Sequence, residues 1–405
     1  ILINNPNKLS NPYWLTNNFS TLFKVENPKD LLQPESKPVF DKKIDLLVVN
    51  DTISILLNGT YKWRIPSFGE KRREVIQAPE FTANFDQKLC ITNPGVKKSV
   101  KLKVHSFREN LSDKIQINAP AGWEVSPSSI DVTLTKMHEE KWIELTVKPD
   151  SSAKSGILTL TNSKENMVHS FTEIIYDHIP TQVIFNHSEM KCVKLDAEIK
   201  PGKIAYIKGV EDAVPEAIEQ LGFEVKRFEV TDLSSLDLSE FQSVVLGIRI
   251  YNVHPELRNF EIKLFDYVKQ GGNLVMQYNT ASRRATGKTY GPFPFELTRN
   301  RVTEEDAQVK FLIPNHPIMT TPNELKKEDF DNWVQERGLY FAGNWDKNYT
   351  PLFSWADKGE DEQKGGLIVT NYGEGQFVYT GISFFRELPN GVEGAYKLFA
   401  NILSY

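Results

Sequence analysis

The sequence is poor in the residues that build disulfide frameworks and metal sites. Only two of its 405 residues are cysteine, Cys90 and Cys192, and neither belongs to a CxxC motif. The seven histidines are scattered, without the HExxH spacing of a zinc enzyme. The sequence therefore predicts neither a disulfide scaffold nor a metal site within this chain.

Long apolar runs and a strong charge of one sign are also missing. No apolar run approaches the roughly 18–20 residues that a membrane-spanning helix needs. The net charge of −5 provides no basic surface of the kind that nucleic acids require. We therefore expect no membrane span and no nucleic-acid partner.

A nucleophile is missing where an α/β enzyme would carry one. The stretch "GGNLVMQYNT" (271–280) reads as a helix end, a strand and a turn, and that turn holds Tyr278 and Asn279. The stretch "GISFF" (381–385) starts like a G-x-S-x-G elbow, but Phe385 replaces the second glycine and would crowd the turn. The sequence thus predicts no catalytic residue.

The first half of the sequence alternates apolar and polar residues with period two. In "SVKLKVHSF", Val100, Leu102 and Val104 share one face, and "KWIELTVKP" repeats the pattern. Such alternation, interrupted by turn sequences, is typical of antiparallel β-sandwiches. We predict two Ig-like sandwich domains, over residues 1–80 and 81–195.

The second half alternates strands with helices. "KIAYIK" predicts a strand, the following residues predict a helix that ends at Gly222, and "NLVMQY" predicts a further strand. The stretch from Val392 to Ile402 has the spacing of an amphipathic helix. This order indicates a doubly wound, flavodoxin-like α/β domain over residues 196–405.

Polar and aromatic side chains gather at the predicted carboxyl ends of these strands, the edge where open α/β sheets bind ligands. Carboxylates, guanidiniums, amides and rings together suit a polyhydroxylated ligand. The alternative is that strand-end loops are polar because they are solvated. The candidate ligand-binding residues are Glu211, Asp212, Arg249, Tyr251, Asn252, Gln277, Tyr278, Asn279 and Arg386.

The stretch "DNWVQERGLYF" (331–341) places charged residues between apolar ones. Either Glu336 and Arg337 belong to the site, or they form a buried ion pair that locks a loop to the sheet. We favour the second interpretation and name Glu336 and Arg337 a candidate structural pair.

Several stretches, taken in order, resemble the C-terminal region of large bacterial PIG-L (LmbE-like) deacetylases. They include "GIRIYNVHPELRNF", "GGNLVMQYNT", "DNWVQERGLYF" and "SFFRELPNGVEGAYKLFANIL", and the similarity extends upstream to "NPYWL" and "GEKRREV". Within it, the last 200 or so residues resemble the class I glutamine-amidotransferase-like fold, especially its trehalose-utilisation branch. "APAGWEVSPSSIDVTL" resembles the small sandwich associated with α-galactosidases.

The resemblance implies an activity that this chain does not itself carry. The family removes an acetyl group from N-acetylglucosamine-type sugars, using zinc held by an N-terminal domain with a His-Pro-Asp-Asp run. That run is absent here, because His254-Pro255 and His316-Pro317 have other successors. No cofactor is expected in this chain, and zinc is implied only for the missing N-terminal domain.

The amidotransferase-like half also departs from its family. The position of the family's cysteine maps to Tyr278-Asn279, and that of its histidine to Ser383–Phe385. Without nucleophile and base, acyl chemistry by that route is lost. The chain begins at Ile1 without a leader, so we expect the C-terminal part of a longer protein. The resemblance implies export to the periplasm or the outside.

Three hypotheses follow. The leading one is a non-catalytic C-terminal portion of an N-acetylglucosaminyl deacetylase, whose partners are a carbohydrate or glycoconjugate and the N-terminal deacetylase domain of the same polypeptide. The second is an autonomous hydrolase that uses Glu211, Asp212, Tyr251 and Arg386 in the same cleft. The third is a purely architectural module.

Overall fold

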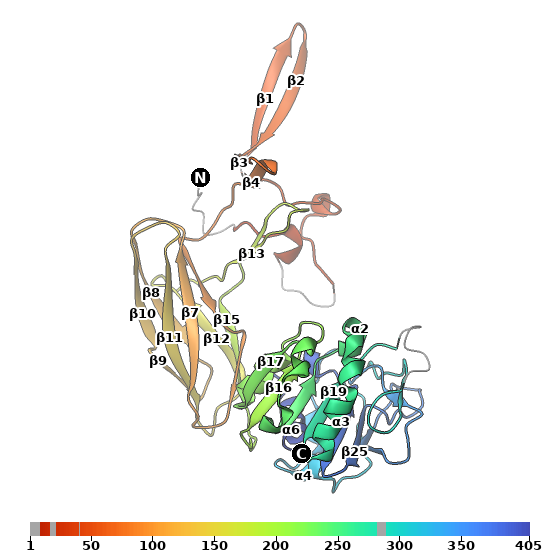
Figure 1. The fold of residues 1–405 in the computed structure, drawn as a ribbon. Coiled ribbons are helices and arrows are strands. Elements are labelled where there is room, and N and C mark those ends of the chain that lie inside the picture. Colours follow the sequence, from red (N-terminus) through yellow and green to blue (C-terminus); the bar gives the residue numbers. More distant parts are fainter. Residues whose placement is uncertain (1–8, 17–21, 40, 282–288) are drawn as a thin grey trace. The chain divides into compact units, whose positions relative to one another are not determined.

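The computed structural model describes residues 9–16, 22–39, 41–281 and 289–405 (Figure 1). The chain divides into two compact units, of which the first comprises residues 1–90 and 95–192. The second comprises residues 91–94 and 193–405. Whether residues 1–80 are separate from residues 81–195 stays a prediction.

The first unit begins with two short 3-10 helices, η1 (Tyr13–Leu15) and η2 (Pro28–Asp30), and two hairpins. β1 (Asp41–Val48) pairs antiparallel with β2 (Asp51–Asn58), and β3 (Thr60–Ile65) pairs with β4 (Gly69–Glu74). Among the described strands, each of these four has one partner. The described strands of residues 1–80 thus form two separate antiparallel hairpins, and the sandwich predicted for these residues stays a prediction.

The sequence of β4, "GEKRRE", has no apolar face, and its residues alternate between half-buried and exposed.

A β-sandwich follows, as the sequence predicts for residues 81–195. One sheet has the order β10-β8-β12-β15-β6 and the other the order β5-β7-β11-β9. A further two-stranded sheet joins β13 to β14. The strands are β5 (Phe81–Phe85), β6 (Leu89–Thr92), β7 (Lys98–Ser106), β8 (Leu111–Asn118), β9 (Trp123–Ser126), β10 (Ser129–Leu134), β11 (Glu140–Pro149), β12 (Gly156–Thr161), β13 (Thr172–Ile174), β14 (Gln182–Ile184) and β15 (Glu189–Lys194).

The alternation in the sequence produces the sandwich core. Val100 of β7 lies opposite Leu145 of β11, and both side chains are fully buried. Cys90 and Cys192 are free thiols in the same core, where they behave as small apolar side chains. Burial raises the pKa of Cys90 to about 11, because a thiolate is poorly solvated in an apolar core.

The second unit is built on a seven-stranded sheet with the order β17-β16-β18-β19-β26-β25-β23. The five strands from β17 to β26 run parallel, whereas β25 and β23 are antiparallel to their neighbours. The strands are β16 (Lys203–Ile207), β17 (Glu224–Phe228), β18 (Ser243–Leu246), β19 (Asn273–Gln277), β23 (Thr350–Pro351), β25 (Leu367–Tyr372) and β26 (Gly375–Thr380). Two small sheets pair β20 (Glu296–Leu297) with β22 (Ala342–Gly343) and β21 (Lys310–Phe311) with β24 (Phe353–Ser354).

Helices cover both faces of this sheet. On one face, Leu274 of β19 packs in a cluster with Leu264 of α3 (Glu261–Lys269). On the other, Asn273 donates to the carbonyl of Ile402 in α6 (Glu393–Ser404). Because successive strand residues point to opposite faces, α3 and α6 lie on opposite sides (Figure 1).

The backbone of this unit requires glycine at two positions, a helix end and a close approach between a strand and a helix. Gly222, with φ of +100°, ends α1 (Val214–Leu221) in the left-handed conformation. A Cβ on Gly375 would lie 2.2 Å from the carbonyl oxygen of Val268, so β26 can approach α3 only with glycine there. The remaining helices are α2 (Ile250–Val253), α4 (Pro317–Thr320), α5 (Phe384–Glu387), η3 (Val230–Ser234), η4 (Leu238–Glu240), η5 (Pro255–Phe260) and η6 (Lys327–Phe330).

The sequence thus predicts the sandwich of residues 81–195 correctly. Assignment of the second half to the flavodoxin-like or amidotransferase-like class stays a prediction. In the described part of the chain, no helix combines the length and the apolarity needed to cross a bilayer.

Candidate functional site

The candidate residues follow the carboxyl ends of three neighbouring strands. β18 and β26 both run parallel to β19 and flank it, so their carboxyl ends meet at one edge of the sheet. The loops that follow bring Arg249, Tyr278 and Arg386 together, since both guanidiniums lie close enough to lower the pKa of the Tyr278 phenol. Burial has the larger effect and raises that pKa overall.

Aromatic rings form the centre of this cluster. The ring of Tyr278 lies 6.0 Å from that of Tyr340 with an interplanar angle of 8°, so the two are stacked. It also lies 5.1 Å from the ring of Phe385. Tyr278 is buried, whereas Tyr340 and Phe385 are half-exposed. We call Tyr278, Tyr340 and Phe385 the aromatic platform: Tyr278 is its base, and the other two rings offer surface to a ligand.

Two guanidiniums border the platform. Arg249 is exposed and precedes α2, and its backbone N–H donates to the carbonyl of Tyr278 at 2.8 Å. Arg386 lies over the Phe385 ring, and its Nε donates to Oε1 of Glu336 at 3.0 Å. It also donates to the side chain of Gln335. Arg386 is therefore held in place, whereas the side chain of Arg249 faces solvent.

The backbone around the platform is held in an unfavourable conformation. Arg249, Gln335 and Tyr340 all have positive φ, of 56°, 68° and 52°. For a bulky side chain this left-handed conformation costs roughly 1–2 kcal/mol of conformational free energy. Favourable contacts in the surrounding structure must offset that cost. Such conformations occur elsewhere in the chain as well, for example at Asn110 and Glu165, so they do not by themselves identify a site.

The predicted amides position the loops and do not face a ligand. Asn279 is fully buried, and its Oδ1 accepts from the backbone N–H of Tyr251 at 2.8 Å. Asn252 and Thr280 bond reciprocally, at 2.8 and 3.1 Å. Gln277 is also buried and donates to the Tyr206 hydroxyl. These amides keep the strand-end loops rigid.

Three other predicted residues, Glu211, Asp212 and Tyr251, are not part of the platform. Both carboxylate oxygens of Asp212 accept from Tyr206, and one also accepts from the N–H of Val214 at the start of α1. Burial raises the pKa of Asp212. The ring of Tyr251 packs against Tyr290 and beneath the guanidinium of Arg258.

Burial raises the pKa of Tyr251, and the Glu261 carboxylate raises it further. Glu211 is exposed. The contacts described for Asp212 and Tyr251 thus involve residues outside the platform.

The predicted pair of Glu336 and Arg337 is corrected by the structure, because Glu336 pairs with Arg386 instead. Arg337 is buried, and its guanidinium donates to the carbonyls of Ala307 and Phe330. Burial lowers its pKa to about 10, and the nearby Glu387 opposes this change. Arg337 still locks a loop to the domain, but it does so through carbonyl groups.

Residues that sequence reasoning missed complete the site. Tyr340 belongs to the stretch 331–341, which is considered for its charged residues. Phe385 belongs to the stretch 381–385, which is considered because it lacks the histidine of the amidotransferase family. Glu387 is fully buried, accepts from the N–H of Val334 at 2.9 Å, and has its pKa raised to about 7 by burial. For Phe385, the adjacent Arg386 after a strand was an available signal, whereas the sequence around Tyr340 offered none.

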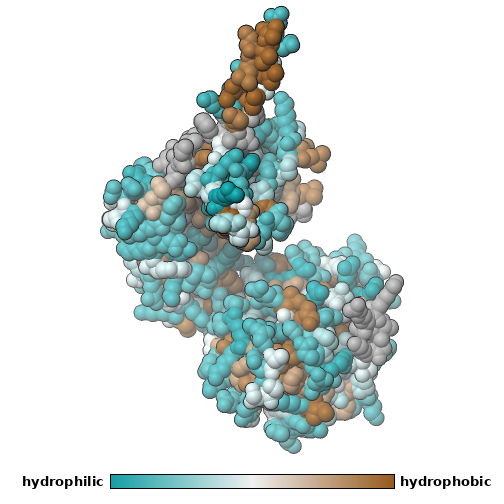
Figure 2. Space-filling model, turned by 45° about the horizontal axis from the view of Figure 1, so that its top comes forward, coloured by the Kyte–Doolittle hydropathy of each residue, from teal (hydrophilic) through white to brown (hydrophobic). Residues whose placement is uncertain are grey.

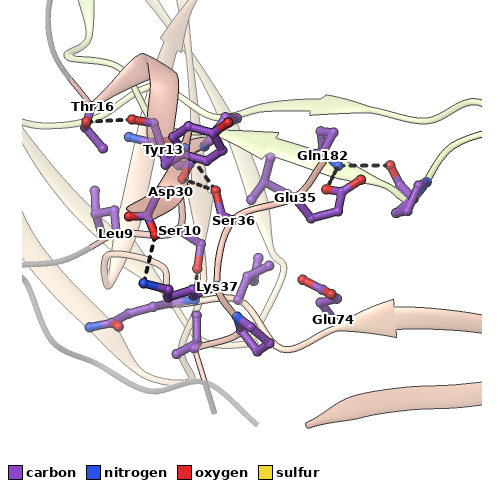
Figure 3. Close-up of a pocket in the computed structure, with 18 of the residues that line it drawn as sticks. Leu9, Ser10, Tyr13, Thr16, Asp30, Glu35, Ser36, Lys37, Glu74 and Gln182 are labelled. Carbon is purple, nitrogen blue, oxygen red and sulfur yellow. Dashed lines mark hydrogen bonds and ion pairs between the residues drawn. The ribbon is translucent and has the colours of Figure 1, made fainter. Parts of the chain in front are cut away.

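A separate cavity of about 490 Å³ lies within the first unit. Figure 3 shows Glu35, Glu74 and Gln182 among its lining side chains. Gln182 donates to Oε2 of Glu35 at 2.7 Å. Burial raises the pKa of Glu74, and the charge of Glu35 raises it further. Sequence reasoning gave no sign of this cavity, because its wall joins segments far apart in the chain.

The cavity has a mixed electrostatic character. Asp30 and Lys37 form an ion pair of 2.8 Å beside it, and Tyr13 donates to the carbonyl of Gln33 at 3.0 Å. No group of three or more potential metal ligands is found among the residues that the structure describes. The carboxylates and the amide that line the cavity could bond to hydroxyl groups of a ligand. Among the described residues they do not form a cage for a cation.

No protein-family model matches this chain, and no curated protein matches it either. Solved structures with some likeness include α2-macroglobulin from E. coli, 13% identical with a TM-score of 0.20 over 36% of this chain. The chain spans only 9% of that protein. CaCohA2 from Clostridium acetobutylicum is 14% identical, with a TM-score of 0.16, over 29% of this chain and 92% of its own. TM-scores this low carry no argument about fold or function.

Proposed function

We propose that this chain is a non-catalytic portion of a PIG-L-type N-acetylglucosaminyl deacetylase, and that its second unit binds carbohydrate at the aromatic platform. The observation that carries the proposal is the pair of half-exposed rings, Tyr340 and Phe385, with the free guanidinium of Arg249 beside them. Rings pack against the C–H faces of sugars, and a guanidinium donates to hydroxyl and acetamido oxygens.

The order of the strands supports the proposed fold class. The five parallel strands can be numbered by their order in the chain, with β16 as the first and β17 as the second. Their order across the sheet, from β17 to β26, is then 2-1-3-4-5. This is the order of flavodoxin-like sheets, in which ligands bind beyond the carboxyl ends of the strands. The platform lies at that edge, which favours binding there.

The chemistry of the edge favours binding over catalysis. An autonomous hydrolase would need its candidate acids and bases to converge on a reacting atom. Asp212 is instead engaged with Tyr206 and the start of α1, and the Tyr251 ring packs against Tyr290. Loss of turnover in a folded Glu211→Gln variant would nevertheless support the hydrolase hypothesis.

The test is a titration of the chain with N-acetylglucosamine oligosaccharides, with maltose-type oligosaccharides as the comparison. We expect Tyr340→Asn to weaken binding at least tenfold, about 1.4 kcal/mol. Asparagine is chosen because it tolerates the left-handed backbone that Tyr340 occupies. Arg249→Ala should weaken binding by a similar factor.

Tyr176→Asn is the matched control, since Tyr176 is an exposed tyrosine of the first unit. If binding persists unchanged in Tyr340→Asn and Arg249→Ala, the platform is not the site, and the cavity beside Glu35 becomes the alternative. If the wild type binds no sugar of either series, the architectural hypothesis replaces the proposal.

A further inference from the structure

The hairpin of β1 and β2 has one apolar face. Directly paired residues of an antiparallel hairpin share a face, and successive pairs alternate between the two faces. The register pairs Ile44 with Ile55 and Leu46 with Ile53. The same face continues with the pairs Lys42–Leu57 and Val48–Asp51. Six apolar side chains therefore line it: Ile44, Leu46, Val48, Ile53, Ile55 and Leu57.

By register, the opposite face holds six polar residues and two leucines, Leu47 and Leu56. On it, Lys43 forms an ion pair of 3.1 Å with Asp45, which also accepts from the Ser54 hydroxyl at 2.5 Å. Thr52 lies on this face as well, opposite Leu47. The hairpin is thus unequal in its two faces, with six apolar residues on the first and two on the second.

The apolar face is uncovered. Ile53 is 51% exposed and Val48 is 50% exposed, and the space-filling view shows a continuous hydrophobic surface over this hairpin (Figure 2). β1 and β2 pair only with each other among the described strands. A two-stranded hairpin is at best marginally stable in water, and an exposed apolar patch of this kind marks an interaction surface.

The charges at the two ends of the face indicate what covers it. Lys42 belongs to the first of the four pairs on this face and Asp51 to the last, with two wholly apolar pairs between them. Neither charge has an ion-pair partner among the residues that the structure describes. A surface with a cation at one end and an anion at the other is complementary to its own copy turned end for end.

We propose that the apolar faces of two hairpins pack against each other across a two-fold axis, so that the chain forms a homodimer. The axis lies in the interface, perpendicular to the strands, at the level of the pair Asp45–Ser54. The Ile44 layer of one copy then faces the Leu46 layer of the other, and Lys42 lies at the level of Asp51 of the second copy. The two sheets would stack about 10 Å apart, as sheets do in sandwiches.

A lipid bilayer is the less suitable occupant. Insertion of the hairpin end would take Asn50 and Asp51 into the hydrocarbon region together with Val48, and a carboxylate there is costly. A dimer instead pairs Asp51 with a lysine. The proposal is independent of the proposed carbohydrate binding, because the platform belongs to the other unit.

Sedimentation velocity over a concentration range of about 1 to 100 μM tests for a dimer of micromolar affinity, roughly −8 kcal/mol. We expect a monomer–dimer equilibrium for the wild type. Ile53→Glu should weaken it at least tenfold, because the new carboxylate falls in the apolar layer. Thr52→Glu is the matched control: it adds the same charge one residue away on the opposite face and should change the equilibrium less than threefold.

Charge reversal tests the two-fold arrangement itself. Lys42→Glu and Asp51→Lys should each weaken the dimer, and the double variant should restore it to within about threefold of the wild type. Circular dichroism of every variant checks that the sandwich and the second unit remain folded.

A wild type that stays monomeric at 100 μM overturns the proposal. Co-sedimentation of that monomer with phosphatidylglycerol vesicles would then identify a bilayer as the occupant. Equal dimerisation of Ile53→Glu and Thr52→Glu also overturns it, since the contact would lie elsewhere. A double charge variant no tighter than the single variants contradicts the two-fold arrangement.

Discussion

The two ends of the central sheet of the second unit use polar side chains in different ways. At the amino end, Asn273 and Ser243 bond to the carbonyls of Ile402 and Leu403, the last ones of α6. At the carboxyl end, Gln277 and Asn279 also bond to neighbouring groups, but Arg249 is exposed and Tyr340 is only half-buried.

This difference separates a purely structural edge from the edge at which we propose binding. A helix end leaves carbonyls without intrahelical partners, and the amino-end side chains satisfy them. Buried amides therefore do not identify a ligand site, because they occur at both ends. The site is identified by rings and charges that remain accessible after the backbone groups have found partners.

The largest effect should come from Arg337→Leu. It leaves the carbonyls of Ala307 and Phe330 without a donor and removes the positive charge near Glu387. We expect a loss of about 3–5 kcal/mol in the free energy of unfolding. Urea unfolding followed by tryptophan fluorescence measures it. Arg299→Leu, at an exposed position, should change stability by about 0.5 kcal/mol or less, and equal losses would contradict the role of Arg337.

A smaller effect, dependent on pH, is expected for Glu387→Gln. The pKa of Glu387 is raised from 4.5 to about 7 in the folded chain. The folded state therefore retains a proton that the unfolded state releases, so wild-type stability falls as pH rises between these two values. Glutamine cannot ionise but still accepts from the Val334 N–H.

The variant should accordingly gain stability relative to the wild type, from about zero at pH 4 to on the order of 2–3 kcal/mol at pH 8. Unfolding measured across this range tests the sign and the size. The exposed Glu374→Gln serves as the control. A difference between Glu387→Gln and the wild type that does not change with pH would show that Glu387 is already ionised at pH 5.

The smallest of these stability effects tests the comparison directly. Asn273→Ala removes the donor to the Ile402 carbonyl and to the Ser243 hydroxyl, and we expect a loss of about 1–3 kcal/mol. Sugar affinity should not change, because the substitution is at the structural edge. Arg249→Ala should show the reverse pattern, with lower affinity and nearly unchanged stability. A joint loss of both properties in either variant would erase the distinction between the edges.

Local patterns in the sequence predict local elements well. The alternation of Val100, Leu102 and Val104 is that of the buried face of β7, and the helix predicted up to Gly222 is α1. These predictions succeed because the periodicity of the apolar residues reports which face is buried. The site residues at strand ends followed from the same reasoning, but only Arg249, Tyr278 and Arg386 meet at the platform.

Contacts between distant residues escape this reasoning. Glu336 and Arg337 are adjacent in sequence, yet the positive φ of Gln335 turns the chain so that Glu336 pairs with Arg386. Tyr340 reaches Tyr278 from a loop sixty-odd residues away in sequence, and no periodicity encodes that approach. Likewise, the alternation of apolar and polar residues in β1 and β2 does not predict whether a second sheet packs against them.

The two thiols of the sandwich have a practical consequence. Cys90 and Cys192 are the only cysteines of the chain, and both lie in the core of the first unit. Burial raises their pKa to about 11 and about 12, so neither offers a thiolate to an alkylating reagent while the sandwich is closed. The two buried thiols can therefore report the opening of the first unit. The rate at which an alkylating reagent modifies them measures how often this unit opens, and no introduced residue is needed.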